Sequence, residues 1–424
     1  MLMIEKINGK IIGETCLKYV HPSGTEIYML PMEGYSTVTA QFSAKFGSQD
    51  NSFRVGNGEF VKIPDGTAHY LEHKLFESEE KDAFSLFAQT GASCNAGTSF
   101  DYTQYYFSCA DRFSENLEIL LDFVANPYFT EENVEKERGI IAQEITMYRD
   151  NPSWRVFTNL LEALYEKNPV RLDIAGTVES IAEITPKTLY DCYNAFYNPA
   201  NMFLCVAGNF DPEDVCRACE EKLRAAVPLN VETMPFDEPY AVAKKLTRLS
   251  MPVAKPIFEL GFKRNAVSGM GEIEDYIYFN ILFDTIFGES SEFYEKMREK
   301  GLLNDEWAVS VFSGRGHIFP TARGESDNPE AVFEEMKRVI REYKKNPPEK
   351  ALFERVKKAT YGSLVRDFNS VQSVASTLSE AALGGVEPFA AINTAAAADY
   401  ETLINKLESL DEENASLSVV DNKE

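Results

Sequence analysis

The chain has 424 residues, of which 44% are hydrophobic, and this is enough for two or three domains with substantial cores. Its 67 acidic and 42 basic residues give a net charge of −25. Such a balance argues against a nucleic-acid-binding surface. A basic peptide partner would suit the charge, but an acidic balance mostly reflects solubility. No run of about 18 or more apolar residues occurs, so no membrane span is expected.

The first residues of the chain and its cysteines indicate the cellular compartment of the protein. The first residues, MLMIEKINGKIIGE, carry acids and have no long apolar core, so they do not resemble a signal peptide. The seven cysteines are scattered. Cys216 and Cys219 form a lone C-x-x-C in a charged helical pattern, without a second pair to complete a zinc site. We expect reduced thiols in a cytoplasmic protein.

The first elements predicted along the chain are strands. Glu14–Val20 and Thr25–Leu30 flank a turn at Pro22–Gly24. The strict alternation from Val38 to Phe46 predicts a half-buried strand, and the polar, glycine-bearing stretch Gly47–Gly58 predicts a loop.

The segment Gly66–Ser78, GTAHYLEHKLFES, holds two of the four histidines. In a helix, His69, Glu72 and His73 would project from one face. Two neutral imidazoles and a neighbouring carboxylate are what a zinc hydrolase uses to hold the metal and to accept a proton. The order His-x-x-Glu-His is the inverzincin signature. A five-residue pattern can also arise by chance on an ordinary amphipathic helix, so the decisive question is whether the chain offers a third ligand.

The elements that follow the motif lead to that candidate ligand. The pattern predicts a helix, two paired strands and a second helix that Ser114 caps and Asn126–Pro127 ends. The first three are Asp82–Thr90, Ala92–Ser99 and Tyr102–Cys109.

A long helix begins after Thr130 and runs to Asp150. Glu137 and Glu144 are seven residues apart in it and therefore share a face. Glu144 is flanked by Ile141, Ala142 and Ile145, a poor setting for a free charge. A metal would explain a carboxylate at this position.

The rest of the first half contains further helices and a strand, with a linker after them. We predict helices at Trp154–Tyr165, Pro186–Tyr197 and Pro212–Arg224, and a strand at Asn201–Ala207. Three prolines and a lack of periodicity indicate a linker within Ala226–Tyr240. We therefore divide the chain into a catalytic domain at 1–233, a linker at 234–243 and a second domain at 244–424.

The second half repeats the pattern of the first. Its predicted strands and helices are Ile257–Phe262, Asp275–Phe287, Ser291–Lys300, Trp307–Phe312, Pro329–Tyr343, Glu349–Asp367, Leu403–Leu410 and Ser416–Val419. When Val134–Asp150 is laid on Phe353–Asn369, Val356 stands in the place of Glu137 and Ser363 in the place of Glu144. The second half has no His-x-x-Glu-His, and its one histidine, His317, is isolated. We predict an α+β unit used twice, each copy a mostly antiparallel sheet packed against helices, with metal chemistry in the first copy alone.

At this point the chain resembles the insulinase–pitrilysin–mitochondrial processing peptidase family of zinc peptidases. The resemblance covers nearly the whole length and is most specific in His69–Glu77, Gly91–Tyr105 and Glu137–Glu144. It is most similar to a Gram-positive bacterial branch of about this length, and the likeness implies paired subunits.

The resemblance assigns roles to residues of this chain. It implies that His69, His73 and Glu144 are zinc ligands and that Glu72 is the general base acting on the metal-bound water. It implies that Glu137 is a catalytic carboxylate beside the ligands that helps to orient the site. Asn95 and Ala96 would lie on an edge strand to which substrate adds, main chain to main chain.

The second half departs from the family pattern. Family members carry there an arginine, followed seven residues later by a tyrosine, and both contact substrate. Here the segment reads MREKGLLNDEW, and Arg298 is available for substrate binding. Counted from Arg298 the tyrosine position falls on Asp305, and counted from Gly301 it falls on Asn304. Neither carries a phenol, which suggests that a homologous partner subunit supplies the arginine–tyrosine pair, unless another residue of the second half does so.

Together these observations predict a zinc-dependent endopeptidase, or the catalytic subunit of a two-subunit peptidase, that contains Zn²⁺ and hydrolyses peptides. One alternative is a non-catalytic assembly or chaperone subunit, which the intact set His69, Glu72, His73 and Glu144 disfavours. The other is a metal-dependent regulator that binds peptide without cutting it, which an intact Glu72 disfavours. Homodimer or heterodimer, cleavage preference and physiological substrate stay open.

Overall fold

The computed structural model describes residues 3–79, 82–224 and 226–423. The chain forms two compact units, and neither is continuous in sequence. Unit 1 comprises Met1–Ile145, Asp173–Pro235 and Val365–Phe389, and unit 2 comprises Thr146–Leu172, Phe236–Leu364 and Ala390–Glu424. Among the described residues, we find no helix with the length and apolarity needed to cross a bilayer.

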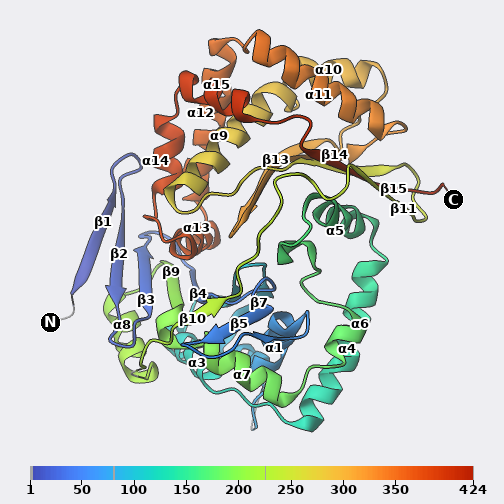
Figure 1. Ribbon diagram of the computed structural model, residues 1–424. Coiled ribbons are helices and arrows are strands. Elements are labelled where there is room, and N and C mark those ends of the chain that lie inside the picture. The colour runs from blue at the N-terminus through green and yellow to red at the C-terminus, as the bar shows by residue number, and fades with distance from the viewer. Residues whose placement is uncertain (1–2, 80–81, 225, 424) are drawn as a thin grey trace. The chain divides into compact units, whose positions relative to one another are not determined.

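Unit 1 is built on a seven-stranded sheet with the order β1-β2-β3-β9-β4-β8-β7 (Figure 1). Strands β3 and β9 run parallel, and the other neighbouring strands of this sheet are antiparallel. Its strands are β1 (Ile4–Gly9), β2 (Glu14–Val20), β3 (Glu26–Pro31), β4 (Val38–Ala44), β7 (Ser93–Thr98), β8 (Thr103–Cys109) and β9 (Met202–Gly208). The sequence predicted each of these except β1.

The central strand β4 corrects one expectation. Its alternation predicted a half-buried strand, but every residue from Val38 to Ala44 is buried. Ala40, Phe42 and Ala44 belong to the hydrophobic core of unit 1. Helix α13 (Val371–Gly384), a segment distant in sequence, packs on β4 and β9 and covers the polar face of the strand.

A second, three-stranded sheet in unit 1 corrects two more expectations. Its order is β10-β5-β6, with β5 (Ser52–Val55), β6 (Val61–Lys62) and β10 (Val231–Thr233). Strand β5 lies inside the predicted loop Gly47–Gly58, and β10 lies inside Ala226–Tyr240, a segment predicted to have no regular structure. Both strands are too short for a periodic signal, and their pairing across the chain is what orders them.

The helices of unit 1 follow local sequence signals at most of their ends. They are α1 (Thr67–Leu75), α2 (Ala83–Thr90), α3 (Phe113–Ala125), most of α4 (Glu131–Arg149), α6 (Val178–Ile181), α7 (Pro186–Phe196), α8 (Pro212–Lys222), α13 and the 3-10 turn η2 (Pro199–Asn201). Thr130 Oγ1 accepts a hydrogen bond from the backbone N–H of Asn133, as expected for a cap. Ser114 is not the cap of α3, because Arg112 precedes that helix in the left-handed region at φ 55°.

Unit 2 contains a five-stranded sheet with the order β11-β15-β12-β14-β13. Its strands are β11 (Leu246–Ser250), β12 (Ile257–Phe262), β13 (Ala308–Gly314), β14 (His317–Glu325) and β15 (Ala415–Asp421). Its helices are α5 (Pro152–Leu164), α9 (Met270–Phe287), α10 (Glu292–Glu299), α11 (Pro329–Lys345), most of α12 (Lys350–Asp367), α14 (Ala390–Ala397), α15 (Tyr400–Ser409) and the 3-10 turn η1 (Pro169–Arg171). The sequence did not predict β11, β14, α13 or α14.

The two sheets repeat one topology, which confirms the predicted α+β repeat. Strands β3-β9-β4-β8-β7 of unit 1 and β11-β15-β12-β14-β13 of unit 2 stand in the same chain order and sheet order. In each set of five, the first two strands (β3 and β9, or β11 and β15) are parallel, and the other neighbouring strands are antiparallel. Each unit has its own hydrophobic core.

Each copy contributes one helix to the other unit. Helix α5 follows α4 and packs on β15 and β12 of unit 2, while α13 follows α12 and packs on β9 and β4 of unit 1. The predicted division into 1–233 and 244–424 is continuous and places α5 in the first domain and α13 in the second. The predicted domain boundaries therefore stay a prediction.

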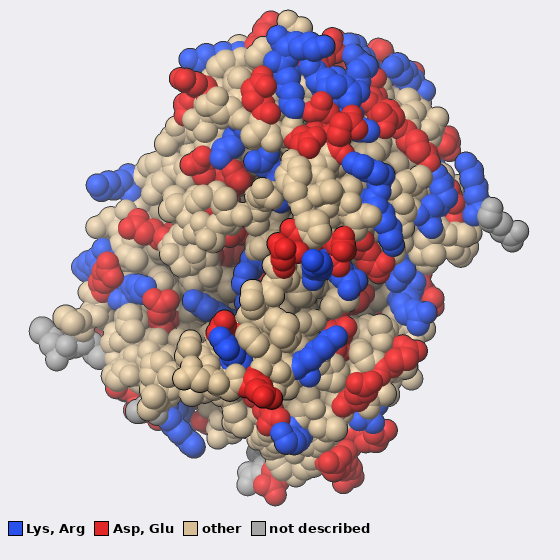
Figure 2. All heavy atoms as spheres, viewed as in Figure 1, with Lys and Arg blue, Asp and Glu red and all other residues tan. Residues whose placement is uncertain are grey.

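Charged side chains of both signs share the surface of unit 2. Figure 2 shows basic and acidic groups side by side in the region where Figure 1 places α10 and α11. Ion pairs within these helices join Lys296 to Glu292 at 2.5 Å and Arg338 to Glu342 at 2.7 Å. The negative net charge is therefore not spread as a uniform acidic coat over these helices.

Candidate metal centre

Helix α1, which carries the His-x-x-Glu-His motif, begins at a glycine that the local packing requires. Gly66 has φ +90°, and a Cβ built there would lie 2.4 Å from the carbonyl oxygen of Ala175. A side chain at this position would meet both backbone strain and a collision with backbone. The start of α1 is thus fixed against a distant segment of unit 1.

The fold brings the three predicted metal ligands together. Nitrogen and oxygen atoms of His69, His73 and Glu144 lie within 4.8 Å of one another. Glu144 Oε2 is 3.7 Å from His69 Nε2 and 3.4 Å from His73 Nε2. Helix α1 supplies the imidazoles and α4 supplies the carboxylate, as their spacing predicted.

Glu137 holds the second imidazole in one orientation. Its Oε1 lies 3.0 Å from His73 Nδ1. When His73 Nδ1 carries the proton and donates to this carboxylate, Nε2 keeps its lone pair and faces Glu144. The hydrogen bond from His73 holds the pKa of Glu137 below its usual value, against the effect of burial.

The two histidines differ in their electrostatic surroundings. Burial, with a smaller effect of the neighbouring His73, lowers the pKa of His69 to about 3, so this imidazole is neutral at neutral pH. Burial also acts to lower the pKa of His73, but the hydrogen bond to Glu137 and the charges of Glu72 and Glu144 outweigh it and raise that pKa. His69 Nδ1 is buried without a hydrogen-bond partner in the described chain, which leaves Nε2 as the nitrogen in contact with Glu144.

Glu72 lies between the two histidines in sequence, and a residue of the seven-stranded sheet orients its side chain. Thr98, at the end of edge strand β7, donates a hydrogen bond from Oγ1 to Glu72 Oε2 at 2.8 Å. Burial raises the pKa of Glu72, while the bond from Thr98 and the charge of His73 oppose the shift. The carboxylate is therefore both positioned and made more basic than an exposed one.

The geometry of these residues fits a zinc ion. Zinc bonds of about 2.0–2.1 Å in a tetrahedron place ligand atoms about 3.3 Å apart. The contacts of Glu144 Oε2 with the two imidazoles, at 3.4 and 3.7 Å, are close to that spacing. Two imidazoles and one carboxylate leave a fourth position open, as in catalytic rather than structural zinc sites.

The residues predicted to bind substrate lie on two different units. Asn95 and Ala96 are on β7, which forms the outer edge of the seven-stranded sheet, and Asn95 is exposed. The side-chain oxygen of Asn95 accepts a hydrogen bond from the N–H of Ala96 at 2.9 Å. Arg298 belongs to α10 in unit 2, where its guanidinium pairs with Asp305 Oδ1 at 3.0 Å. The structure therefore does not bring Arg298 together with the metal cluster within one unit.

The phenol nearest in sequence to Arg298 does not replace the missing tyrosine. The Arg298 guanidinium carbon lies 5.7 Å from the centroid of the Tyr294 ring. The Tyr294 hydroxyl, however, donates to the carbonyl of Asn304 at 3.2 Å, and the ring is buried.

Two residues around the site were missed by sequence reasoning. Thr98 stands on a predicted strand, but no spacing rule links it to Glu72, 26 positions away. Lys74 follows the motif directly and looks like a solvated charge, yet its side chain is fully buried. A buried lysine carries no sequence signal, since burial is decided by the helix that packs against it.

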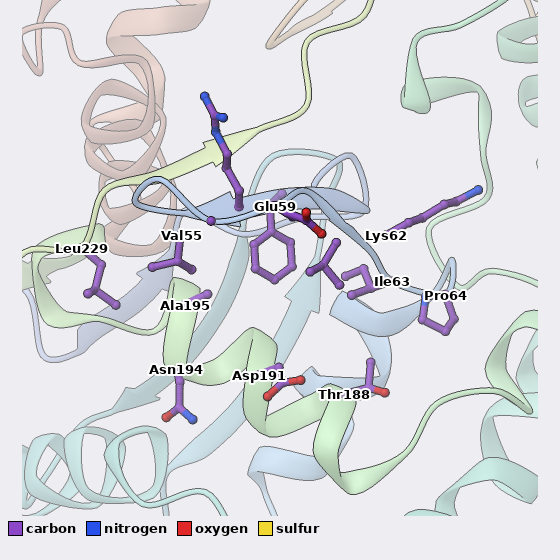
Figure 3. Close-up of a pocket in the computed structure, with 14 residues that line it drawn as sticks. Val55, Glu59, Lys62, Ile63, Pro64, Thr188, Asp191, Asn194, Ala195 and Leu229 are labelled. Carbon is purple, nitrogen blue, oxygen red and sulfur yellow. The ribbon is translucent and has the colours of Figure 1, made fainter.

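Unit 1 also contains a cavity of about 520 Å³, but the metal cluster does not line it. Its wall combines apolar side chains of β5 and β6 with polar side chains of α7 (Figure 3). Ile63 and Pro64 form one end of the wall and continue into α1 through Gly66. The cavity therefore lies beside the start of α1 and not at the candidate metal ligands.

Comparison with known proteins decides the family. Residues 55–178 match the family described as "Insulinase (Peptidase family M16)", and residues 183–360 match "Peptidase M16 inactive domain". The chain is 39% identical over 344 residues to "Uncharacterized zinc protease YmfH" of Bacillus subtilis (strain 168), a match that covers 80% of each chain. The chain belongs to the insulinase (M16) family.

Solved structures agree with this assignment to the insulinase family. The crystal structure of an M16-like peptidase from Alicyclobacillus acidocaldarius superposes with a TM-score of 0.92, at 32% identity and 99% coverage of both chains. A protease from Helicobacter pylori superposes with a TM-score of 0.81 at 17% identity, covering 99% of this chain and all of the other, which supports the fold alone.

Proposed function

We propose that this protein is a zinc-dependent endopeptidase, or the catalytic subunit of a two-subunit one. The observation that carries the proposal is the convergence of His69, His73 and Glu144 within 4.8 Å beside the buried Glu72. The naming of a relative at 39% identity as a zinc protease supports it.

In this proposal His69, His73 and Glu144 hold the zinc ion. When bound there, zinc supplies a Lewis acid and lowers the pKa of water. Glu137 fixes the imidazole of His73 through Nδ1. Manganese or cobalt would find the same donors, and zinc is chosen from the ligand types.

Glu72 serves as general base. Its carboxylate would accept the proton of the attacking water and return it to the leaving amine, and Thr98 holds it in place for both transfers. Edge strand β7 would receive the substrate as an added strand at Asn95 and Ala96, because no strand of the described residues pairs with its outer edge.

The test is cleavage of a quenched basic peptide by the purified chain with one equivalent of zinc, run beside Glu72→Gln. We expect the variant to bind zinc normally and to lose roughly 10²–10⁴-fold in kcat/KM, the usual contribution of a general base. If wild type and Glu72→Gln cleaved equally, Glu72 would not be the base.

We also propose a homologous partner subunit that supplies the arginine–tyrosine pair. The pairing of Arg298 with Asp305 and the engagement of Tyr294 with Asn304 support this, since neither group is poised for a substrate carbonyl. Adding a homologous subunit that carries the pair should raise cleavage by a zinc-loaded chain. Unchanged rates for the mixture, and for Asp305→Tyr and Asn304→Tyr in the isolated chain, would remove the need for a partner. The acidic net charge supports basic peptides as substrates, and the seven free cysteines support a cytoplasmic location.

A further inference from the structure

Lys74, the residue after the His-x-x-Glu-His motif, is a buried ammonium beside the candidate metal centre. Its side chain is 0% exposed, and Nζ lies 2.6 Å from Glu77 Oε2 and 3.9 Å from Glu137 Oε2. An ammonium group is expensive to bury unless it is paired. Two carboxylates around one lysine satisfy that requirement.

Glu137 connects this lysine to the metal-binding imidazole. One carboxylate oxygen, Oε1, contacts His73 Nδ1 at 3.0 Å, and the other, Oε2, faces Lys74 Nζ. Neighbouring residues of a helix project about 100° apart, so His73 and Lys74 leave α1 in different directions. The Glu137 carboxylate, which comes from α4, therefore has one oxygen hydrogen-bonded to His73 and the other within ion-pair distance of Lys74.

The balance of charge around the site needs such a group. Glu72, Glu137 and Glu144 all lie in contact with the imidazoles or between them, and a carboxylate repels its neighbours in a buried setting. Without Lys74, Glu137 would keep the exposed Lys136 as a more distant positive neighbour. The carboxylate would then be free to rotate, which would move Oε1 away from His73.

We propose that Lys74 is a positioning residue for the metal centre. It acts through Glu137, which it orients so that His73 Nδ1–H donates and Nε2 is presented to the metal. The inference rests on the proposed function, because it takes His73 as a zinc ligand. Lys74 itself contacts neither the candidate ligand atoms nor the place of the substrate.

The matched control is Lys263, a buried lysine of unit 2. Its side chain is 3% exposed, and Nζ donates to Glu238 at 2.6 Å and to the carbonyls of Pro239 and Ala241 at 2.8 and 3.1 Å. Lys74→Met and Lys263→Met therefore remove the same buried charge, one beside the metal cluster and one in the unit that has none among its described residues.

The first measurement is zinc affinity, by competition with a chromogenic chelator. We expect Lys74→Met to weaken zinc binding by about 10–100-fold, the range for partners of metal-bound histidines. Lys263→Met should leave the affinity within about twofold. Because Lys74 acts through Glu137, Lys74→Met/Glu137→Gln should bind zinc no more weakly than Glu137→Gln alone. Unchanged affinity in folded Lys74→Met, or additive losses in the double variant, would overturn the inference.

A second measurement separates this inference from the proposed function. Nitrogen-15 spectra of the imidazoles in the zinc-free protein, at about pH 9 where histidine is neutral, report the tautomer of His73. We expect the proton on Nδ1 in wild type and a mixture of tautomers in Lys74→Met. A wild type that binds no zinc would overturn the proposed function, whereas equal tautomer populations in wild type and Lys74→Met would overturn the role of Lys74.

Two further variants, at Glu77, control for loss of folding and for loss of the buried ion pair. Lys74→Met leaves Glu77 without its partner at 2.6 Å, so Lys74→Met/Glu77→Gln removes both charges if the single variant does not fold. Glu77→Gln alone leaves Lys74 beside Glu137 and should retain wild-type zinc affinity. Loss of affinity in Glu77→Gln equal to that in Lys74→Met would show that burial of the ion pair matters, and not the contact with Glu137.

Discussion

The two units share five strands in the same order, yet one brings together three candidate metal ligands and the described part of the other does not. The difference lies in side chains placed on equivalent helices. Helix α4 carries Glu137 and Glu144, whereas α12 has Val356 and Ser363 at the positions laid on them. A fold that buries its own core in each copy leaves such positions free to differ.

The same comparison extends to the sheet face that the exchanged helix covers. In unit 1, Gln41 under α13 donates to Ser376 Oγ and accepts from Ser379 Oγ at 2.7 Å, so its amide is satisfied. In unit 2, Glu259 on β12 is buried, and its Oε1 accepts a hydrogen bond from Thr321 Oγ1 at 3.2 Å. Thr321 has a single hydroxyl proton and also reaches the carbonyl of Leu260 at 2.7 Å. A neutral amide thus occupies this buried face in one copy, and a carboxyl group whose pKa burial raises to about 7 occupies it in the other.

The largest effect is expected when a candidate metal ligand of unit 1 is replaced and the equivalent residue of unit 2 serves as control. Glu144→Gln should lower zinc affinity by more than about 100-fold and abolish cleavage, because losing a ligand costs more than losing a ligand's partner. Ser363→Ala at the equivalent position of α12 should leave zinc binding intact. Calorimetry with and without zinc tests both variants through the gain in unfolding free energy that zinc gives. A metal at 100 times its Kd stabilises the folded state by about 2.7 kcal/mol. Equal zinc stabilisation of Glu144→Gln and wild type would exclude Glu144 as a ligand.

The next effect concerns the start of the metal-binding helix. Gly66→Ala should destabilise the protein by about 3–4 kcal/mol, from the positive φ and from the clash with the Ala175 carbonyl. Gly91→Ala is the control, because Gly91 has φ +76° with nothing within 4 Å of its Cβ position, and it should cost about 1–2 kcal/mol. Urea unfolding gives both values, and equal losses would show that the contact with Ala175 does not matter.

A pH effect sharpens the contrast between Glu259 and Gln41. Burial raises the pKa of Glu259 to about 7, above its value of 4.5 in the unfolded chain. The folded state therefore binds more protons between these values, and the free energy of unfolding should fall by about 3 kcal/mol as pH rises from 4.5 to 7. Glu259→Gln should remove this fall, and Gln41→Glu should introduce a similar one in unit 1. Identical pH profiles of stability for wild type and Glu259→Gln would contradict the assignment.

The smallest effect is expected at the surface of unit 2. The side chains of Arg298 and Asp305 are 52% and 81% exposed, so their ion pair is screened by water. Arg298→Ala should change the free energy of unfolding by no more than about 0.5 kcal/mol. A larger loss of stability would give Arg298 a structural role, and a raised KM at unchanged stability would support the substrate contact that the sequence predicted for Arg298 and would argue against an arginine supplied by a partner.

Local patterns in the sequence were sufficient to propose the metal ligands and to predict most elements. His69, Glu72 and His73 share a helix face by spacing alone, and an acid among isoleucines marks Glu144. The alternation of β4 and the caps of α2 and α4 are likewise short-range signals.

Other features depend on contacts that no local pattern contains. The burial of the polar face of β4 comes from α13, more than 300 residues away, and the sheet β10-β5-β6 exists through pairing across the chain. The bond from Thr98 to Glu72 and the burial of Lys74 beside Glu137 arise where separate elements pack together. The sequence by itself determined which residues can bind a metal, through periodicity. Only the tertiary structure decided what positions them, because burial and pairing are properties of packed elements and not of neighbouring residues.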